Sequence, residues 1–266
     1  VWANYIMPYD QGYLSKSLDT VAPTDTYTYS QMVADMAVLG EQYPGLVTVS
    51  SIGTSELGAD IPVMLLGDPN APYQVLLQGA VHGREHMTAW LLMAMADYWL
   101  DNSLFSYGKV CYHIIPMVNP DGVAISQSQT LNENQLEIYL SDLAYGFTTE
   151  SESCYARNWK ANGLGVDINR NFASGWETIN NRLLPSSESF QGLQPFSTAE
   201  AAALRDYTLL YPFNATVNYH AFGSIIYYEY GSKEPVNSQS SSLASTVKRA
   251  TRYPLVGSSG VAAAGY

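Results

Sequence analysis

Hydrophobic positions along the chain recur at spacings that alternate between those of helices and those of strands. The first helical pattern starts after Thr28, which forms a capping-box sequence with Gln31 and precedes apolar residues three to four positions apart. A Pro-Gly pair at residues 44–45 ends this helix. Short apolar runs at residues 46–49 and 61–66 then predict two strands joined by a glycine-containing turn.

Similar patterns continue to the end of the chain. We predict further strands at residues 75–77, 110–118, 213–219 and 225–228, and further helices at residues 88–100, 197–210 and 243–253. The second of these helices starts behind a capping box that joins Ser197 to Glu200. Residues 124–156 are polar with weak periodicity, which predicts a long surface excursion. The order of elements predicts one α/β domain at residues 25–266, preceded by an N-terminal arm or linker at residues 1–24.

Composition narrows the possible partners. The 266 residues suit one large domain, and only 14% of them are charged, against about 25% in average proteins. The net charge of −12, with 12 lysine and arginine residues, argues against a nucleic-acid partner. No apolar run approaches the roughly 18 residues that a membrane span needs. Cys111 and Cys154 could form one disulfide, but two buried free thiols are the favoured state.

The candidate chemistry lies in the turn that follows the apolar run at residues 75–77. Glycines bracket this turn, which presents His82 and Glu85 three residues apart, so one short piece of chain can supply two metal ligands. Catalytic zinc takes three protein ligands and keeps an open position for water, and two histidines with one glutamate are an established set. His220 follows a later apolar strand. It is the candidate third ligand, because α/β proteins place their sites at such strand ends.

Two other interpretations fit the same residues. The sequence from His82 to His86 also matches H-x-x-E-H, in which the two histidines bind zinc and Glu85 is the general base. That arrangement requires a helix across the motif, whereas Gly83 after a strand favours a turn. The candidate ligands could also be ordinary polar groups at strand ends. We expect His86, and His113 within its strand, to be structural histidines.

Four motifs in a fixed order give the chain a family resemblance. They are His82-Gly83-Arg84-Glu85, Asn119-Pro120-Asp121-Gly122, and the runs at residues 165–172 and 218–223. Together they resemble the zinc carboxypeptidases, the family of carboxypeptidase A, from about Thr26 to Tyr266. The run Trp-Lys-Ala-Asn at residues 159–162 resembles the bacterial branch that includes γ-D-glutamyl-meso-diaminopimelate peptidases.

The resemblance implies a mixed, twisted β-sheet with helices on both faces and one bound Zn²⁺. His82, Glu85 and His220 would hold the ion. Asp167 would orient His82 through a hydrogen bond that fixes the imidazole tautomer and raises its basicity. Arg84 would line the substrate groove.

The same motifs imply how a substrate would be held. Asn169 and Arg170 would receive a free C-terminal carboxylate, which a planar guanidinium binds through two parallel hydrogen bonds. Carboxypeptidase A-like members carry an arginine just after the tryptophan, where it polarises the scissile carbonyl, and this chain has Lys160 there. Lys160 can stabilise an oxyanion as a point charge, and Arg157 is the alternative donor.

The implied activity is that of a zinc metallocarboxypeptidase, which hydrolyses a peptide bond next to a free C-terminal carboxylate. A cell-wall peptide is a candidate substrate. The family's general base is a glutamate on a late strand, beyond the loop that here ends at Tyr266. We therefore expect a truncated chain that lacks the C-terminal strand and helix. The alternatives are a non-catalytic binder of peptides or cell-wall stems, and an amidase or deacylase on the same scaffold. We expect a monomer in an extracellular or cell-envelope location.

Overall fold

The computed structural model describes residues 20–104, 108–174, 176–178, 182–221, 223–228 and 236–257 of the chain. These residues form two compact units, which divide after His220. Residues 1–19 of the predicted arm, and Tyr266, lie outside the described residues. Within the described ranges, no helix is both long enough and apolar enough to cross a membrane.

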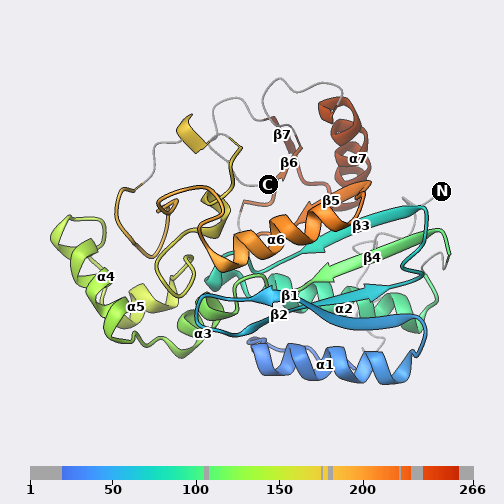
Figure 1. Ribbon diagram of the computed structural model, residues 1–266, viewed down its shortest axis with the longest axis horizontal. Helices are drawn as coiled ribbons and strands as arrows, with labels where there is room; N and C mark the ends of the chain where they lie inside the picture. Colours follow the sequence, from blue (N-terminus) through green and yellow to red (C-terminus); the bar gives the residue numbers. More distant parts are fainter. Residues whose placement is uncertain are drawn as a thin grey trace. The chain divides into compact units, whose positions relative to one another are not determined.

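The larger unit is built on a five-stranded sheet with the order β1-β2-β4-β3-β5 (Figure 1). Its strands are β1 (Val47–Thr54), β2 (Asp60–Leu66), β3 (Tyr73–Gln78), β4 (Val110–Ile115) and β5 (Ala215–Asn218). β2 pairs antiparallel with β1 and with β4, whereas β3 pairs parallel with β4 and with β5. The predicted mixed sheet is therefore confirmed.

Helices cover both faces of this sheet (Figure 1). The helices of this unit are α1 (Tyr29–Gln42), α2 (Met87–Asp101), α3 (Pro120–Ser128), α4 (Glu133–Ala144), α5 (Glu152–Arg157) and α6 (Ala199–Leu210). In β2, Ile61, Val63 and Leu65 enter a buried cluster with α6, whereas Met64 and Leu66 enter a cluster with α1 and α2. Alternate side chains thus face opposite layers, as in a strand that is buried on both sides.

Residues 124–156, predicted as a long surface excursion, are mostly helical, because α3, α4 and α5 occupy most of the segment. Each of these helices follows an N-cap residue whose side chain accepts a hydrogen bond from a backbone N–H of the first turn. The N-cap residues are Asn119 for α3, Asn132 for α4 and Ser151 for α5. The buried side chains of α4 are polar, Gln135 and Asp142. Its apolar side chains are only partly buried, as at Ile138 and Tyr139, or exposed, as at Leu140 and Leu143.

Caps define where the two predicted capping-box helices begin. The Thr28 hydroxyl accepts a hydrogen bond from the Gln31 backbone, and the Gln31 side chain accepts one from the Thr28 backbone, so the box at α1 is confirmed. In α6 the cap is Thr198. The Glu200 carboxylate accepts hydrogen bonds from Glu56 N and Asn162 Nδ2 and closes no box with Ser197, so the predicted box is wrong.

His113 in β4 is a structural histidine, as predicted. It is fully buried, with Nδ1 2.6 Å from the Tyr207 hydroxyl and Nε2 2.6 Å from Gln74 Oε1. Burial lowers the pKa of His113 to about 4, so the ring is neutral at physiological pH. Cys111 and Cys154 are free thiols, which agrees with the favoured state, although only Cys111 is buried.

The smaller unit, described by itself, holds a two-stranded parallel sheet and one helix. The strands are β6 (Ile226–Tyr227) and β7 (Leu255–Val256), and α7 (Val236–Thr251) lies between them in sequence. α7 begins before the helix predicted at residues 243–253. Its first half is rich in serine and has little hydrophobic periodicity to mark the true start.

Candidate metal centre

The turn after β3 is shaped by a close backbone contact. A Cβ atom on Gly83 would lie 2.3 Å from the carbonyl oxygen of Gly122, so a larger residue would have to displace backbone. The turn continues as the short 3-10 helix η3 (Gly83–Glu85), and α2 begins only at Met87. The sequence from His82 to His86 is therefore a turn, as Gly83 predicts, and not one continuous α-helix.

Buried polar side chains fasten this turn to its surroundings. Thr88 Oγ1 accepts a hydrogen bond of 2.7 Å from Ala80 N and donates one of 2.8 Å to the Glu85 carbonyl. Asn119 Nδ2, at the start of α3, donates to the Val81 carbonyl at 3.1 Å. The sequence predicts only a turn at Asn119. The hydrogen bond from its side chain to the Val81 carbonyl could not be predicted, because it joins two loops that are distant in sequence.

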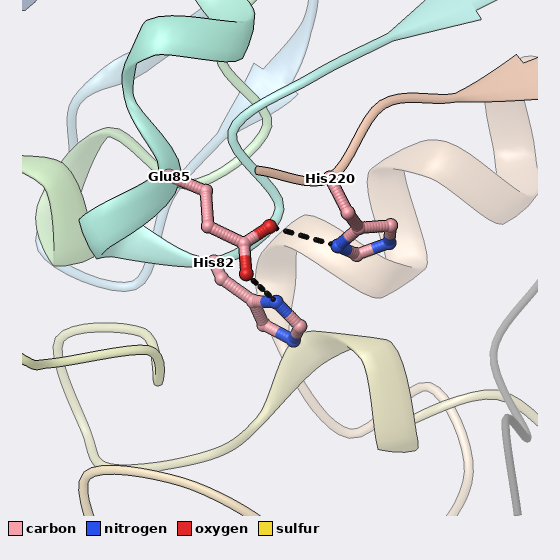
Figure 2. A group of neighbouring side chains, drawn as sticks. All are labelled: His82, Glu85 and His220. Carbon is pink, nitrogen blue, oxygen red and sulfur yellow. Dashed lines mark hydrogen bonds and ion pairs between the residues drawn. The ribbon is translucent and has the colours of Figure 1, made fainter. Parts of the chain in front are cut away.

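Three candidate ligands converge beside this turn (Figure 2). His82 Nδ1 lies 2.9 Å from Glu85 Oε1, and His220 Nδ1 lies 2.9 Å from Glu85 Oε2. One donor atom from each residue lies within 4.8 Å of the other two. His82 and Glu85 are each 6% exposed, whereas the His220 side chain is 33% exposed. The group is thus closed on the side of the turn and accessible on the side of His220.

The sheet explains why His220 meets residues from a distant part of the sequence. β3 and β5 are parallel neighbours, with Gln78 opposite Asn218. The Tyr219 backbone continues the pairing by donating to the Gln78 carbonyl at 2.8 Å. His82 and His220 follow these strands by a few residues, so both emerge at the same carboxyl-end edge of the sheet, where α/β proteins place their sites.

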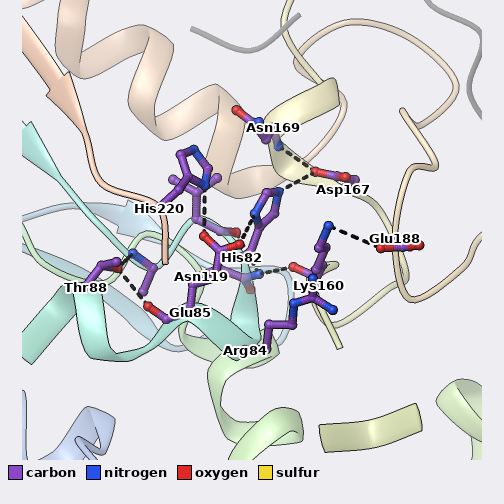
Figure 3. A network of polar contacts seen from close by, with 12 residues as sticks. His82, Arg84, Glu85, Thr88, Asn119, Lys160, Asp167, Asn169, Glu188 and His220 are labelled. Atoms are coloured by element: carbon purple, nitrogen blue, oxygen red, sulfur yellow. Dashed lines mark hydrogen bonds and ion pairs between the residues drawn. The ribbon is translucent and has the colours of Figure 1, made fainter. Parts of the chain in front are cut away.

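Asp167 lies behind His82 (Figure 3). Its Oδ1 atom is 3.2 Å from His82 Nε2 and also accepts a hydrogen bond of 3.1 Å from Asn169 N. Its Oδ2 atom accepts a hydrogen bond of 3.1 Å from Ser189 N. Because Nε2 faces this carboxylate, the Nδ1 atom of His82 is the nitrogen that points toward Glu85 and His220.

The electrostatics of the group follow from burial and close opposite charges. Burial disfavours the charged form of His82, but Asp167 and Glu85 outweigh it and raise the pKa of His82 to about 9. Burial also opposes ionisation of Glu85, yet hydrogen bonds from His220 and His82 hold its pKa well below the usual range. The pKa of Asp167 is likewise held low, against burial, by the charge of His82. Both carboxylates are therefore ionised at neutral pH.

These residues fit the zinc ion that their donor set suggests. Two imidazole nitrogens and one carboxylate are a known ligand set of catalytic zinc, and a ligating histidine commonly donates its other N–H to a carboxylate. His86 does not join the group. It is the cap residue of α2, and its Nδ1 atom is buried without a hydrogen-bond partner in the described part of the chain. The geometry therefore favours His220 over His86 as the third ligand.

The predicted carboxylate-binding residues lie next to Asp167. Asn169 and Arg170 belong to the 3-10 helix η4 (Ile168–Arg170), which Asp167 caps. Arg170 Nη1 donates to the Asn169 carbonyl at 3.2 Å. The exposed Arg84 lies on η3, within 3.5 Å of the Asn158 carbonyl. Asn169 and Arg170 thus lie on the short helix that Asp167 caps, and Arg84 lies on the same short helix as the candidate ligand Glu85.

The two candidate oxyanion donors differ in their surroundings. Lys160 Nζ lies 3.2 Å from Glu188 Oε2 (Figure 3), and the Lys160 carbonyl accepts a hydrogen bond of 3.1 Å from Gly83 N in the turn after β3. The Arg157 guanidinium instead donates to Cys154 Sγ at 3.3 Å, along its own helix α5. The sequence offers no signal for Glu188, because its contact with Lys160 depends on how an irregular segment folds back.

Comparisons with known proteins identify relatives of this chain. The sequence matches the zinc carboxypeptidase family over residues 32–262. The γ-D-glutamyl-L-diamino acid endopeptidase 1 of Lysinibacillus sphaericus is 30% identical over 226 residues, which cover 80% of this chain and 55% of that protein. An inactive metallocarboxypeptidase, ECM14 of Uncinocarpus reesii, is 24% identical over 245 residues, which cover 82% of this chain and 38% of that protein.

Solved structures show the same fold. The crystal structure of carboxypeptidase A from Helicoverpa armigera superposes with a TM-score of 0.68 at 22% identity, covering 92% of this chain and 61% of that one. The chain spans about half the length of the curated relatives it matches, with 55% of the endopeptidase and 38% of the inactive relative covered. Because the family match takes in most of the sequence, the chain belongs to the zinc carboxypeptidase family.

Proposed function

We propose that this chain forms the zinc-binding part of a peptidase that hydrolyses the amide bond next to a free C-terminal carboxylate. The observation that carries the proposal is the convergence of His82, Glu85 and His220, whose donor atoms lie within 4.8 Å of one another. Asp167, behind His82, supports it further, because such a carboxylate orients a ligating imidazole. Bound zinc supplies a Lewis acid that polarises a carbonyl and makes water a better nucleophile.

The substrate's terminal carboxylate would be held by Asn169 and Arg170. Both lie in η4, which Asp167 caps, so the proposed carboxylate site and the support of His82 share one turn. A guanidinium can make two parallel charge-assisted hydrogen bonds to a carboxylate, which fixes the substrate in register with the metal centre. Arg84, exposed on η3, would line the path of the preceding substrate residues.

Lys160 is our choice for the group that stabilises the developing negative charge on the scissile carbonyl. Its carbonyl accepts a hydrogen bond of 3.1 Å from Gly83 N in the turn of the candidate metal centre, whereas the Arg157 guanidinium contacts Cys154 on its own helix. A fixed cation aimed at a developing oxyanion is among the strongest contributions to such catalysis. We assign no general base among the described residues. In this proposal a carboxylate from elsewhere in the protein accepts the proton of the attacking water.

A cell-wall peptide is the substrate class that we favour. The support is the relative from Lysinibacillus sphaericus, whose name describes an endopeptidase acting between γ-D-glutamyl and L-diamino acid residues. A substrate of that class would place the protein outside the cell or in the cell envelope.

A second candidate function is the binding of peptides or cell-wall stems without hydrolysis. It is favoured by the similarity to a metallocarboxypeptidase that is described as inactive. Such a protein would keep the zinc ligands and the carboxylate site but would release no product.

Zinc content and peptide cleavage by the full-length protein test both candidates. We expect about one zinc ion per chain in the wild type and in His86→Ala, and almost none in His220→Ala. We also expect cleavage of a peptide with a free C-terminal carboxylate, and none of its amide. Zinc loss in His86→Ala with retention in His220→Ala would overturn the ligand assignment. Full zinc content and peptide binding without cleavage would support the binder.

A further inference from the structure

An irregular segment at residues 186–190 runs beside the candidate centre and is fastened to it at two points. The Ser187 carbonyl accepts hydrogen bonds from Lys160 N at 2.9 Å and from Ala161 N at 2.8 Å. The Ser189 backbone donates to Asp167 Oδ2 at 3.1 Å. The segment therefore has a fixed position relative to both Lys160 and Asp167, and the residue between the two fastening points is Glu188.

Glu188 is part of a row of alternating charges that starts in the protein interior. Asp142 on α4, with a side chain only 3% exposed, lies 3.1 Å from Arg182 Nη1. Arg182 Nη2 is 3.8 Å from Glu188 Oε1, and Glu188 Oε2 is 3.2 Å from Lys160 Nζ. The Arg182 guanidinium also lies over the Phe147 ring, 4.6 Å from its centre. Each charge is thus held by its neighbour, and the row ends at the Lys160 ammonium, whose contact with Glu188 is drawn in Figure 3.

A lysine at this position needs such a partner more than an arginine would. The ammonium is a point charge on a flexible four-carbon stem, whereas a guanidinium is pre-organised by its planar fork. A cation stabilises a transition state only if it is already placed where negative charge develops. Ion pairs as exposed as this one, with side chains 24% and 38% exposed, contribute little to stability. The contact is therefore better suited to orientation than to folding.

We infer that Glu188 is a positioning residue, which holds the Lys160 ammonium toward the scissile carbonyl of the substrate. The inference rests on the proposed function, because it takes Lys160 as the group that stabilises the oxyanion. It predicts that Glu188 affects only ligands that carry negative charge at the scissile position, and only while Lys160 is present.

Binding of a phosphinic peptide tests the inference without requiring turnover. This probe carries a charged tetrahedral group in place of the scissile amide and a free C-terminal carboxylate. Its affinity for the zinc-loaded full-length protein is measured by titration calorimetry for Glu188→Gln, Lys160→Met and the double variant. We expect Glu188→Gln to weaken binding about tenfold when Lys160 is present and not at all when Lys160 is replaced by methionine. Such a coupling is typical of residues in contact.

Two controls separate positioning from general effects. Glu137→Gln removes the same charge from an exposed position on α4 and should leave the affinity unchanged. An N-acyl amino acid carries the carboxylate but no charged tetrahedral group, so Glu188→Gln should not alter its binding. An equal loss in both Lys160 backgrounds would show that Glu188 contacts the ligand itself, and would overturn the inference. An unchanged affinity in Glu188→Gln would also overturn it.

The reactivity of Lys160 provides a second measurement that does not depend on the proposed function. Acetylation of each lysine by acetic anhydride is followed by mass spectrometry, with the exposed Lys109 as the internal reference. We expect Glu188→Gln to speed the labelling of Lys160 about threefold relative to Lys109, the size expected for loss of a partly exposed ion pair. Faster labelling without any phosphinic-peptide binding would refute the proposed function but keep the contact. Unchanged labelling would overturn the inference outright.

Discussion

Replacing Glu200 by glutamine should change how the stability of this protein depends on pH. Glu200 is fully buried on α6, where Oε1 accepts a hydrogen bond from Glu56 N and Oε2 accepts one from Asn162 Nδ2. Burial raises the pKa of this carboxyl from 4.5 to about 7, and the nearby charge of Asp121 adds to the shift, although the hydrogen bonds oppose it. A substantial fraction of the folded protein is therefore protonated at Glu200 near neutral pH.

The magnitude follows from the linkage between protonation and folding. Between pH 4.5 and about pH 7 the folded state binds more protons at Glu200 than the unfolded state does, so stability falls as the pH rises through this window. The difference between the ordinary pKa of 4.5 and the value of about 7 in the folded state, at about 1.4 kcal/mol for each pH unit, gives a loss of ~3 kcal/mol above pH 7. Glutamine does not titrate, so Glu200→Gln should lack this loss.

The assay must compare the variant with the wild type, because His113 acts in the opposite direction. The pKa of His113 is lowered from 6.5 to about 4 by burial, so its contribution to stability is lost as the pH falls through that window. The stability changes caused by Glu200 and His113 are similar in size and opposite in sign. Together they would flatten the dependence of wild-type stability on pH. Urea unfolding with a chelator present, at pH 4.5 and pH 8, gives the difference between the two proteins.

From pH 4.5 to pH 8 we expect this difference to move by ~3 kcal/mol in favour of Glu200→Gln. Any constant penalty from placing the glutamine amide opposite an N–H donor cancels in the comparison. A difference that stays constant across this range would refute the reasoning, because it would mean that Glu200 titrates normally in the folded state.

Three further predictions concern the candidate centre. Gly83→Ala should destabilise the protein by ~2–4 kcal/mol and abolish zinc retention, because its Cβ would meet the Gly122 carbonyl at 2.3 Å. Gly40→Ala, in α1 with its nearest atom at 3.9 Å, should keep zinc and be neutral or stabilising in the same urea and zinc-content measurements. Asp167→Asn should weaken zinc binding roughly 10–100-fold in chelator competition, and an unchanged affinity would contradict its role behind His82. Arg170→Gln should raise KM for a peptide with a free carboxylate roughly 10–100-fold in kinetic assays of the full-length protein, and an unchanged KM would contradict its role.

Much of this fold could be predicted from the sequence, because burial sets the spacing of hydrophobic residues along its helices and strands. The strands around His82 carry apolar runs that both faces of the sheet need, and α1 carries a complete capping box at Thr28. The helices at residues 120–157 were not predicted, and in α4 the buried residues are the polar Gln135 and Asp142 while Leu140 and Leu143 are exposed. In such a segment the caps carry the signal, and they are weaker evidence than an apolar stripe.

The candidate site divides in a similar way. The spacing of His82 and Glu85 within a glycine-bracketed turn is local, so the sequence predicts that these two residues lie together. The position of His220 follows only from the parallel pairing of β3 with β5. Glu188 could not be predicted at all, because its contact with Lys160 depends on backbone hydrogen bonds between irregular segments. Contacts of that kind have no periodic pattern in the sequence.

The central claim is that His82, Glu85 and His220 hold one zinc ion. Anomalous diffraction at the zinc edge from crystals of the zinc-loaded protein tests it most directly. We expect one peak about 2.0–2.2 Å from His82 Nδ1, a Glu85 carboxylate oxygen and His220 Nδ1. A peak bound by His82 and His86, with Glu85 outside the coordination sphere, would contradict the assignment and establish the H-x-x-E-H arrangement instead.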